Sequence, residues 1–188
     1  MGSDMVKDWR ISSFNGALLA AYFIPVWTII AFRIVASPIH GLYERPNISV
    51  ALFIAEHVQL AGVGTVRAAW LLALGRLTVV AFFALFLVLV SRPAVRKAGG
   101  CDEALAVALG IGSLISFAGM VMAGQAGEAA ALKLHATELL LLLGNAILLA
   151  VEAPARTAAA KDLPPGRRSS LGGALRSLAT GAWNVVQR

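Results

Sequence analysis

Long apolar stretches alternate with short polar ones along the chain. They predict membrane-spanning helices, because a helix needs about 20 mostly apolar residues to cross the hydrocarbon core of a bilayer. The first stretch is longer than the roughly 7–15 apolar residues of a signal peptide, so we expect it to remain as an anchor. The pattern predicts an all-α integral membrane protein with one transmembrane domain, residues 1–153, and four spans at residues 14–36, 68–90, 104–124 and 134–151.

The segment at residues 48–61 has helical spacing but carries polar side chains, including Glu56 and Gln59, along one side. A further full span here would leave almost no residues to turn before the next span begins. Gly62 and Gly64 permit a break in the helix instead. We therefore expect a short additional helix that is interfacial or partly re-entrant, and the sequence leaves that choice open.

Composition and charge place this domain in a membrane with a defined orientation. Of the 188 residues, 59% are hydrophobic and 14% are charged, against about 45–50% and about 25% in soluble domains. Eleven of the sixteen Lys and Arg residues fall in the N-terminal segment, the loop after the second span and the tail. The positive-inside rule makes these regions cytoplasmic. We expect the protein to lie in the inner membrane with both termini in the cytoplasm and residues 48–61 on the outer side. We expect the basic residues to contact lipid rather than nucleic acid.

Four polar residues stand out against the apolar background: Arg76, Glu138, Glu56 and Asn145. Ionisable groups inside a membrane are costly and face protein, water or a partner. We expect Arg76 to pair with Glu138, or with Glu56 if the outer helix folds back. We expect Asn145 to face protein. A structural ion pair is the simplest interpretation, and a polar route through a small channel or transporter is the functional alternative.

Two histidines, His57 and His135, are candidate cofactor ligands. Glu56 adjoins His57, and Glu138 follows His135 by three residues on the same helical face. The two imidazole rings together could ligate the iron of a haem, and either ring alone could ligate a chlorin pigment. No HExxH motif occurs and Cys101 is the one cysteine, so we predict neither a metal site nor a disulfide within the chain. Hydrogen-bonded or solvated histidines are the default interpretation.

Small residues four apart mark the third span as a packing helix. Gly112 and Ser116 continue a spacing that begins at Ala108, and Gly119 lies one turn further on. Such residues let a second helix approach closely. We therefore expect the third span to lie at the centre of the helix packing.

The tail at residues 154–188 is basic and predicts an amphipathic helix after a proline-containing segment. Its leucines recur at helical spacing, with arginines off the centre of the apolar stripe. Such a helix lies on the inner leaflet or docks on a partner. The residues expected to make this contact are Arg168, Leu171, Leu175, Arg176, Leu178 and Trp183.

No sequence motif points to a reaction. A phosphate-binding loop, a nucleophile elbow and a plausible catalytic triad are all absent from the sequence, so we expect no catalysis. The favoured hypothesis is an accessory or scaffold subunit of a larger bacterial-type inner-membrane complex. The alternatives are a haem- or pigment-binding electron-transfer protein that uses His57 and His135, and a small oligomeric channel or transporter.

Overall fold

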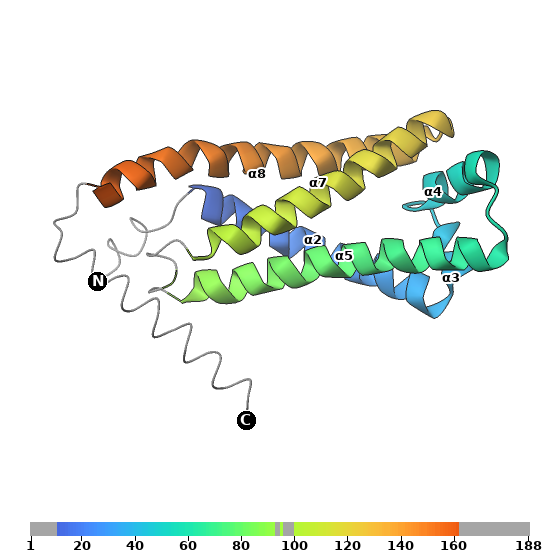
Figure 1. Cartoon of the computed structure of the whole chain (residues 1–188), viewed down its shortest axis with the longest axis horizontal. Coiled ribbons are helices and arrows are strands. Elements are labelled where there is room, and N and C mark those ends of the chain that lie inside the picture. Colours follow the sequence, from blue (N-terminus) through green and yellow to red (C-terminus); the bar gives the residue numbers. More distant parts are fainter. Residues whose placement is uncertain (1–10, 93–94, 96–99, 162–188) are drawn as a thin grey trace, which may run out of the picture. The chain divides into compact units, whose positions relative to one another are not determined.

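Four long helices make up most of the structure, a computed structural model that describes residues 11–92, 95 and 100–161, with side chains up to residue 152. Each helix is long and apolar enough to cross a membrane, which confirms the four predicted spans. They are α2 (Ile11–Ala36), α5 (Gly62–Ser91), α7 (Asp102–Gln125) and α8 (Ala129–Lys161), shown in Figure 1. The described part of the chain contains no strand.

All four helices extend beyond their predicted bounds, and α5 and α8 extend the furthest. Helix α5 begins at Gly62 rather than at residue 68. Helix α8 begins at Ala129 and continues beyond residue 151 to Lys161, through alanine-rich segments that favour helix. Contacts divide the chain into two units between residues 149 and 150.

The connection between α2 and α5 is folded against the bundle. It contains α3 (Pro38–Leu42), α4 (Ile48–Phe53) and the π-helical turn η1 (Ile54–Val58). Figure 1 shows α3 and α4 beside the first part of α5. A Cβ at Gly41 would lie 2.7 Å from the Ile34 Cα, so only glycine allows α3 to approach α2 this closely. The Asn47 amide then donates a hydrogen bond to the Gly41 carbonyl at 2.8 Å.

The segment expected to form one outer helix is divided. Helix α4 passes into η1, and Gln59 then adopts a left-handed conformation with φ of 50°. The helical conformation is interrupted over residues 59–61, immediately before Gly62 and Gly64, which lie in the first turn of α5. The predicted break therefore exists, but a glutamine adopts the turn conformation.

Aromatic and aliphatic side chains fill the centre of the bundle. Phe23 of α2 stacks on Phe83 of α5 with ring centroids 5.7 Å apart. Leu105 of α7 and Leu142 of α8 are fully buried in the same cluster. A second apolar cluster, around Ile34 and Leu42, joins the far end of α2 to α3, α4 and α5. Along α5, the buried Arg76 lies between Ala73 of the second cluster and Val79 of the first.

Candidate functional site: a buried polar cluster

Five polar or aromatic side chains from the four long helices form what we call the central cluster. Each is at most 4% exposed. Polar groups with so little exposure, between apolar clusters, require partners within the protein. The members are Trp27 of α2, Arg76 of α5, Ser116 of α7, and His135 and Glu138 of α8.

The Glu138 carboxylate is the centre of the hydrogen bonding in this cluster. The Trp27 indole N–H donates to its Oε1 at 3.1 Å. The Ser116 hydroxyl donates to its Oε2 at 3.4 Å, and His135 Nδ1 lies 3.2 Å from the same oxygen. Three helices therefore supply partners to one carboxylate, which compensates for its removal from water.

Arg76 contacts the other members of the cluster through the aromatic face of Trp27, on which its guanidinium lies. Its guanidinium carbon lies 5.6 Å from the centroid of the Trp27 ring, in a cation–π arrangement. Its charge is close enough to Glu138 for an electrostatic attraction, yet no hydrogen bond or ion pair joins the two among the described residues. The indole of Trp27 contacts both groups, so the pairing expected between Arg76 and Glu138 is indirect. The alternative partner, Glu56, is exposed in η1.

Three nitrogen atoms of the cluster have unused hydrogen-bonding capacity. Arg76 Nε and Nη1 and His135 Nε2 are buried and have no hydrogen-bond partner in the described part of the chain. An unmade hydrogen bond of a buried group costs about 1–3 kcal/mol, and more where the group is charged. Both residues line a cavity of about 170 Å³ between α4, α5, α7 and α8. The other residues that line it are Val50, Leu72, Leu114, Ile115, Ala118, Gly119 and Met122.

The hydrogen bond to Glu138 fixes the tautomer of a neutral His135 ring. An ionised carboxylate only accepts hydrogen bonds, so the proton of a neutral ring lies on Nδ1 and leaves a lone pair on Nε2. Gly119 makes room for the ring, since a Cβ there would lie 2.9 Å from His135 Nε2. On the same helix, the Ser116 hydroxyl contacts Glu138. Gly112 packs on Leu142, because a Cβ at Gly112 would lie 3.2 Å from that side chain.

The structure does not bring the two candidate cofactor ligands together. His57 is exposed and stacks on Phe53, with ring centroids 4.8 Å apart. His135 is buried and bonded to Glu138. No ring contact or hydrogen bond joins the two histidines, and no group of three or more His, Cys, Asp or Glu side chains in the described residues is arranged to hold a metal ion. Cofactor binding by these residues stays a prediction.

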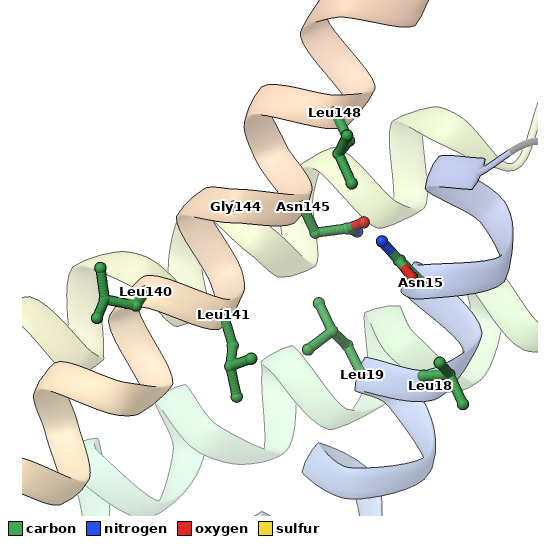
Figure 2. A pocket seen from close by; sticks show the side chains of 8 residues that line it. All are labelled: Asn15, Leu18, Leu19, Leu140, Leu141, Gly144, Asn145 and Leu148. Carbon is green, nitrogen blue, oxygen red and sulfur yellow. The ribbon is translucent and has the colours of Figure 1, made fainter.

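Asn145 forms a second polar site, nearer the start of α2. It is 3% exposed, and neither its oxygen nor its nitrogen has a hydrogen-bond partner in the described part of the chain. It lines a pocket of about 360 Å³ between α2 and α8, across which Asn15 points toward it (Figure 2). Leu18 and Leu140 line the same pocket and are 56% and 72% exposed, so the pocket opens at the lipid-facing surface. We call it the Asn145 groove.

Two residues of these sites were not predicted from the sequence. Trp27 counts as apolar in a hydropathy pattern, but tryptophan is enriched at membrane interfaces, so a tryptophan in the middle of a span was the available signal for its indole N–H. Asn15 lies next to the polar N-terminal segment and resembles an ordinary flank of a span. The predicted docking residues of the tail lie outside the described residues: Arg168, Leu171, Leu175, Arg176, Leu178 and Trp183.

Comparison of the chain with protein-family models, with curated proteins and with solved structures finds no match.

Proposed function

We propose that the protein is a non-catalytic accessory or scaffold subunit of a larger assembly in the inner membrane. The observation that carries this proposal is the unpartnered amide of Asn145 beside a groove between α2 and α8. A buried polar group without a partner costs about 1–3 kcal/mol. In a membrane, a side chain from another helix is the natural source of the hydrogen bonds that Asn145 lacks.

The occupant of the Asn145 groove is a transmembrane helix of another subunit that carries an amide or hydroxyl side chain. The leucines at the rim of the groove supply the apolar contact for such a helix. Gly144 supplies the space, because it is exposed and a Cβ there would meet no atom within 4 Å. A small residue beside a polar one favours close approach of helices in lipid.

The distribution of basic residues supports an orientation with both termini in the cytoplasm. Asn15 lies near the start of α2 and therefore in the cytoplasmic half of the membrane, together with Asn145, which it faces. The partner's polar residue belongs to the same half.

On the outer side, α4 buries Ser49 and Val50, whereas residues 55–58 of η1, which include the charged Glu56, are exposed. An exposed carboxylate favours an interfacial segment over a re-entrant one.

The basic tail provides a second contact in this proposal. Its leucine stripe and its arginines suit the inner leaflet or the cytoplasmic face of the partner. A contact in the membrane and one at its surface would act together, because the first holds the second at high effective concentration. The tail alone is therefore expected to bind more weakly than the whole chain.

Purification in mild detergent from the native membrane, followed by native mass spectrometry, tests the proposal. The chain alone has a mass of 19.6 kDa, and we expect a heavier particle of fixed composition. Gly144→Ile fills the groove and should release the chain from that particle. Gly110→Ile is the matched control, because Gly110 is also exposed on a transmembrane helix with no atom within 4 Å of a Cβ. A particle that Gly144→Ile leaves intact would refute the role of the groove.

The visible absorption spectrum of the same preparation tests the cofactor hypothesis. A chain that runs alone and coloured, and loses its absorption when His57 or His135 is replaced, would be a haem or pigment protein instead. A chain that runs alone and colourless would favour a channel or transporter that uses Arg76, Glu138 and Asn145.

A further inference from the structure

The exposed face of α2 carries a gap in the hydrogen bonding of its backbone. Pro25 lies inside this helix and is exposed, as is Ala21 one turn before it. Proline has no N–H, so the carbonyl of Ala21 lacks the donor that a regular helix would provide. No side chain in the described part of the chain donates to this carbonyl. In a membrane, a backbone group freed by proline is satisfied by a neighbouring helix, a hydroxyl side chain or an ordered water.

Tyr22 adds a hydroxyl group to the same face. The residue is 40% exposed, and its hydroxyl makes no hydrogen bond within the residues that the structure describes. Tyrosine is enriched at the two interfaces of a membrane, where its hydroxyl contacts water. Tyr22 instead lies near the midpoint of α2, which covers residues 11–36. A free carbonyl and a free hydroxyl from adjacent residues thus lie on a surface that otherwise contacts lipid.

We propose that the partner helix in the Asn145 groove continues along this face of α2 and places a hydrogen-bond donor beside Ala21 and Tyr22. The inference rests on the proposed function, because it describes the same partner in more detail. Leu18 connects the two sites. It lines the groove (Figure 2) and is 56% exposed, and it lies one helical turn from both Ala21 and Tyr22.

Spacing along α2 defines the pattern expected in the partner. Asn15 lines the groove, and Tyr22 follows it by seven residues. Seven residues are nearly two turns, so the two side chains lie on one side of α2, about 10 Å apart along its axis. A partner helix that packs along α2 therefore carries two polar side chains about seven residues apart, one for each site.

The chemistry of this face favours an uncharged donor. A backbone carbonyl only accepts hydrogen bonds. The hydroxyl of Tyr22 is close enough to the Glu138 carboxylate for an electrostatic interaction, and a second carboxylate there would be repelled by the first. The side chains of Ser, Thr, Asn and Gln contain donor and acceptor atoms and add no charge to the membrane. They are also the side chains that form hydrogen bonds between membrane helices.

Two substitutions remove these polar groups and leave the groove open. Pro25→Ala restores the N–H that bonds the Ala21 carbonyl within α2, and Tyr22→Phe removes one hydroxyl. Tyr43→Phe is the matched control, because Tyr43 is 49% exposed but follows α3 in the outer connection. Gly144→Ile, which fills the groove, reports on the proposed function itself. Each full-length variant is purified from the native membrane, and native mass spectrometry measures dissociation of the heavier particle on dilution.

We expect Tyr22→Phe to raise the Kd of the particle about threefold, which corresponds to about 0.6 kcal/mol, an average hydrogen bond between membrane helices. Pro25→Ala should raise it by a similar factor although its melting temperature rises, because α2 gains a hydrogen bond. Tyr43→Phe should match the wild type. The partner, identified by its mass in the same particle, should carry Ser, Thr, Asn or Gln at two positions about seven residues apart in one span.

The outcomes separate this inference from the proposed function. If Gly144→Ile releases the chain but Tyr22→Phe and Pro25→Ala bind as tightly as Tyr43→Phe, the inference is overturned and the proposed function stands. Water or lipid would then satisfy the two groups. A partner span without a second polar residue overturns the inference as well. A wild-type chain that runs alone contradicts both the inference and the proposed function. Thermal unfolding verifies that each variant is folded.

Discussion

The indole N–H of Trp27 donates a hydrogen bond to the carboxylate of Glu138 at 3.1 Å, although the two residues lie 111 positions apart. The same indole presents its face to Arg76. One side chain of the first span therefore contacts both opposite charges that the second and fourth spans bury. This arrangement holds α2, α5 and α8 in one register, because a shift of any of the three helices would break a polar contact inside an apolar core.

Trp27→Phe should destabilise the fold by about 1–3 kcal/mol, because it leaves one oxygen of the Glu138 carboxylate without its donor. The loss is measured as a change in the free energy of unfolding in a denaturing-detergent titration. Trp70→Phe is the control, since Trp70 is 51% exposed on α5, and surface substitutions usually change stability by less than about 0.5 kcal/mol. Equal effects of the two variants would contradict the role given to Trp27.

Arg76 and Glu138 should be energetically coupled although they do not touch. Arg76→Met and Glu138→Gln each leave one buried charge uncompensated, and each should destabilise the fold by about 3–5 kcal/mol. The double variant should lose less than the sum, with a coupling of about 0.5–3 kcal/mol. The same unfolding titration on all four proteins measures it. Strictly additive losses would mean that the two charges do not compensate one another.

Gly119→Ala should be destabilising in spite of the better helix propensity of alanine. The added Cβ would lie 2.9 Å from the His135 ring, which is held by its bond to Glu138, and such overpacking costs about 1–3 kcal/mol. Gly110→Ala on the same helix meets nothing within 4 Å and should gain up to about 1 kcal/mol. Melting temperatures of the two variants should therefore move in opposite directions. A shift of both in the same direction would show that α7 does not pack on His135 this closely.

Gly41→Ala tests the packing of the outer connection on α2. Its Cβ would lie within 2.9 Å of backbone atoms of Arg33 and Ile34, and backbone does not move aside as a side chain does. We expect residues 38–58 to detach, which would appear as faster amide hydrogen exchange in this segment while α7 stays protected. Gly62→Ala, with no atom within 4 Å of the new Cβ, should leave exchange unchanged. Unaltered exchange in Gly41→Ala would contradict the close approach of α3 to α2.

The sequence predicts the spans and their unusual polar residues, because both depend on contrast with an apolar background. Arg76, Glu138 and Asn145 are conspicuous for that reason, and all three are buried in the structure. Pattern alone does not predict the role of Trp27, since its ring adds to the apolar count while its N–H supplies the bond that organises the cluster.

The different environments of the two histidines follow from packing between distant segments. His135 is buried because α7 presents Gly119 to its ring, whereas His57 lies on a π-helical turn whose exposure depends on how α4 folds back. The break after that turn depends on the left-handed conformation of Gln59. Glutamine carries no sequence signal for this conformation, which glycine adopts most readily, so the sequence predicts the break at Gly62 and Gly64, immediately after the residues where it occurs.

Site-specific photocrosslinking in the native membrane tests the central claim most directly, namely that the Asn145 groove holds a helix of another subunit. A benzophenone amino acid is placed at Leu140, which lines the groove, and for comparison at Ile147, which is 63% exposed on the same helix outside the groove lining. We predict one discrete heavier adduct from position 140, lost when Gly144→Ile is added, and none from position 147. The same adducts from both positions, or none from position 140, would contradict the claim.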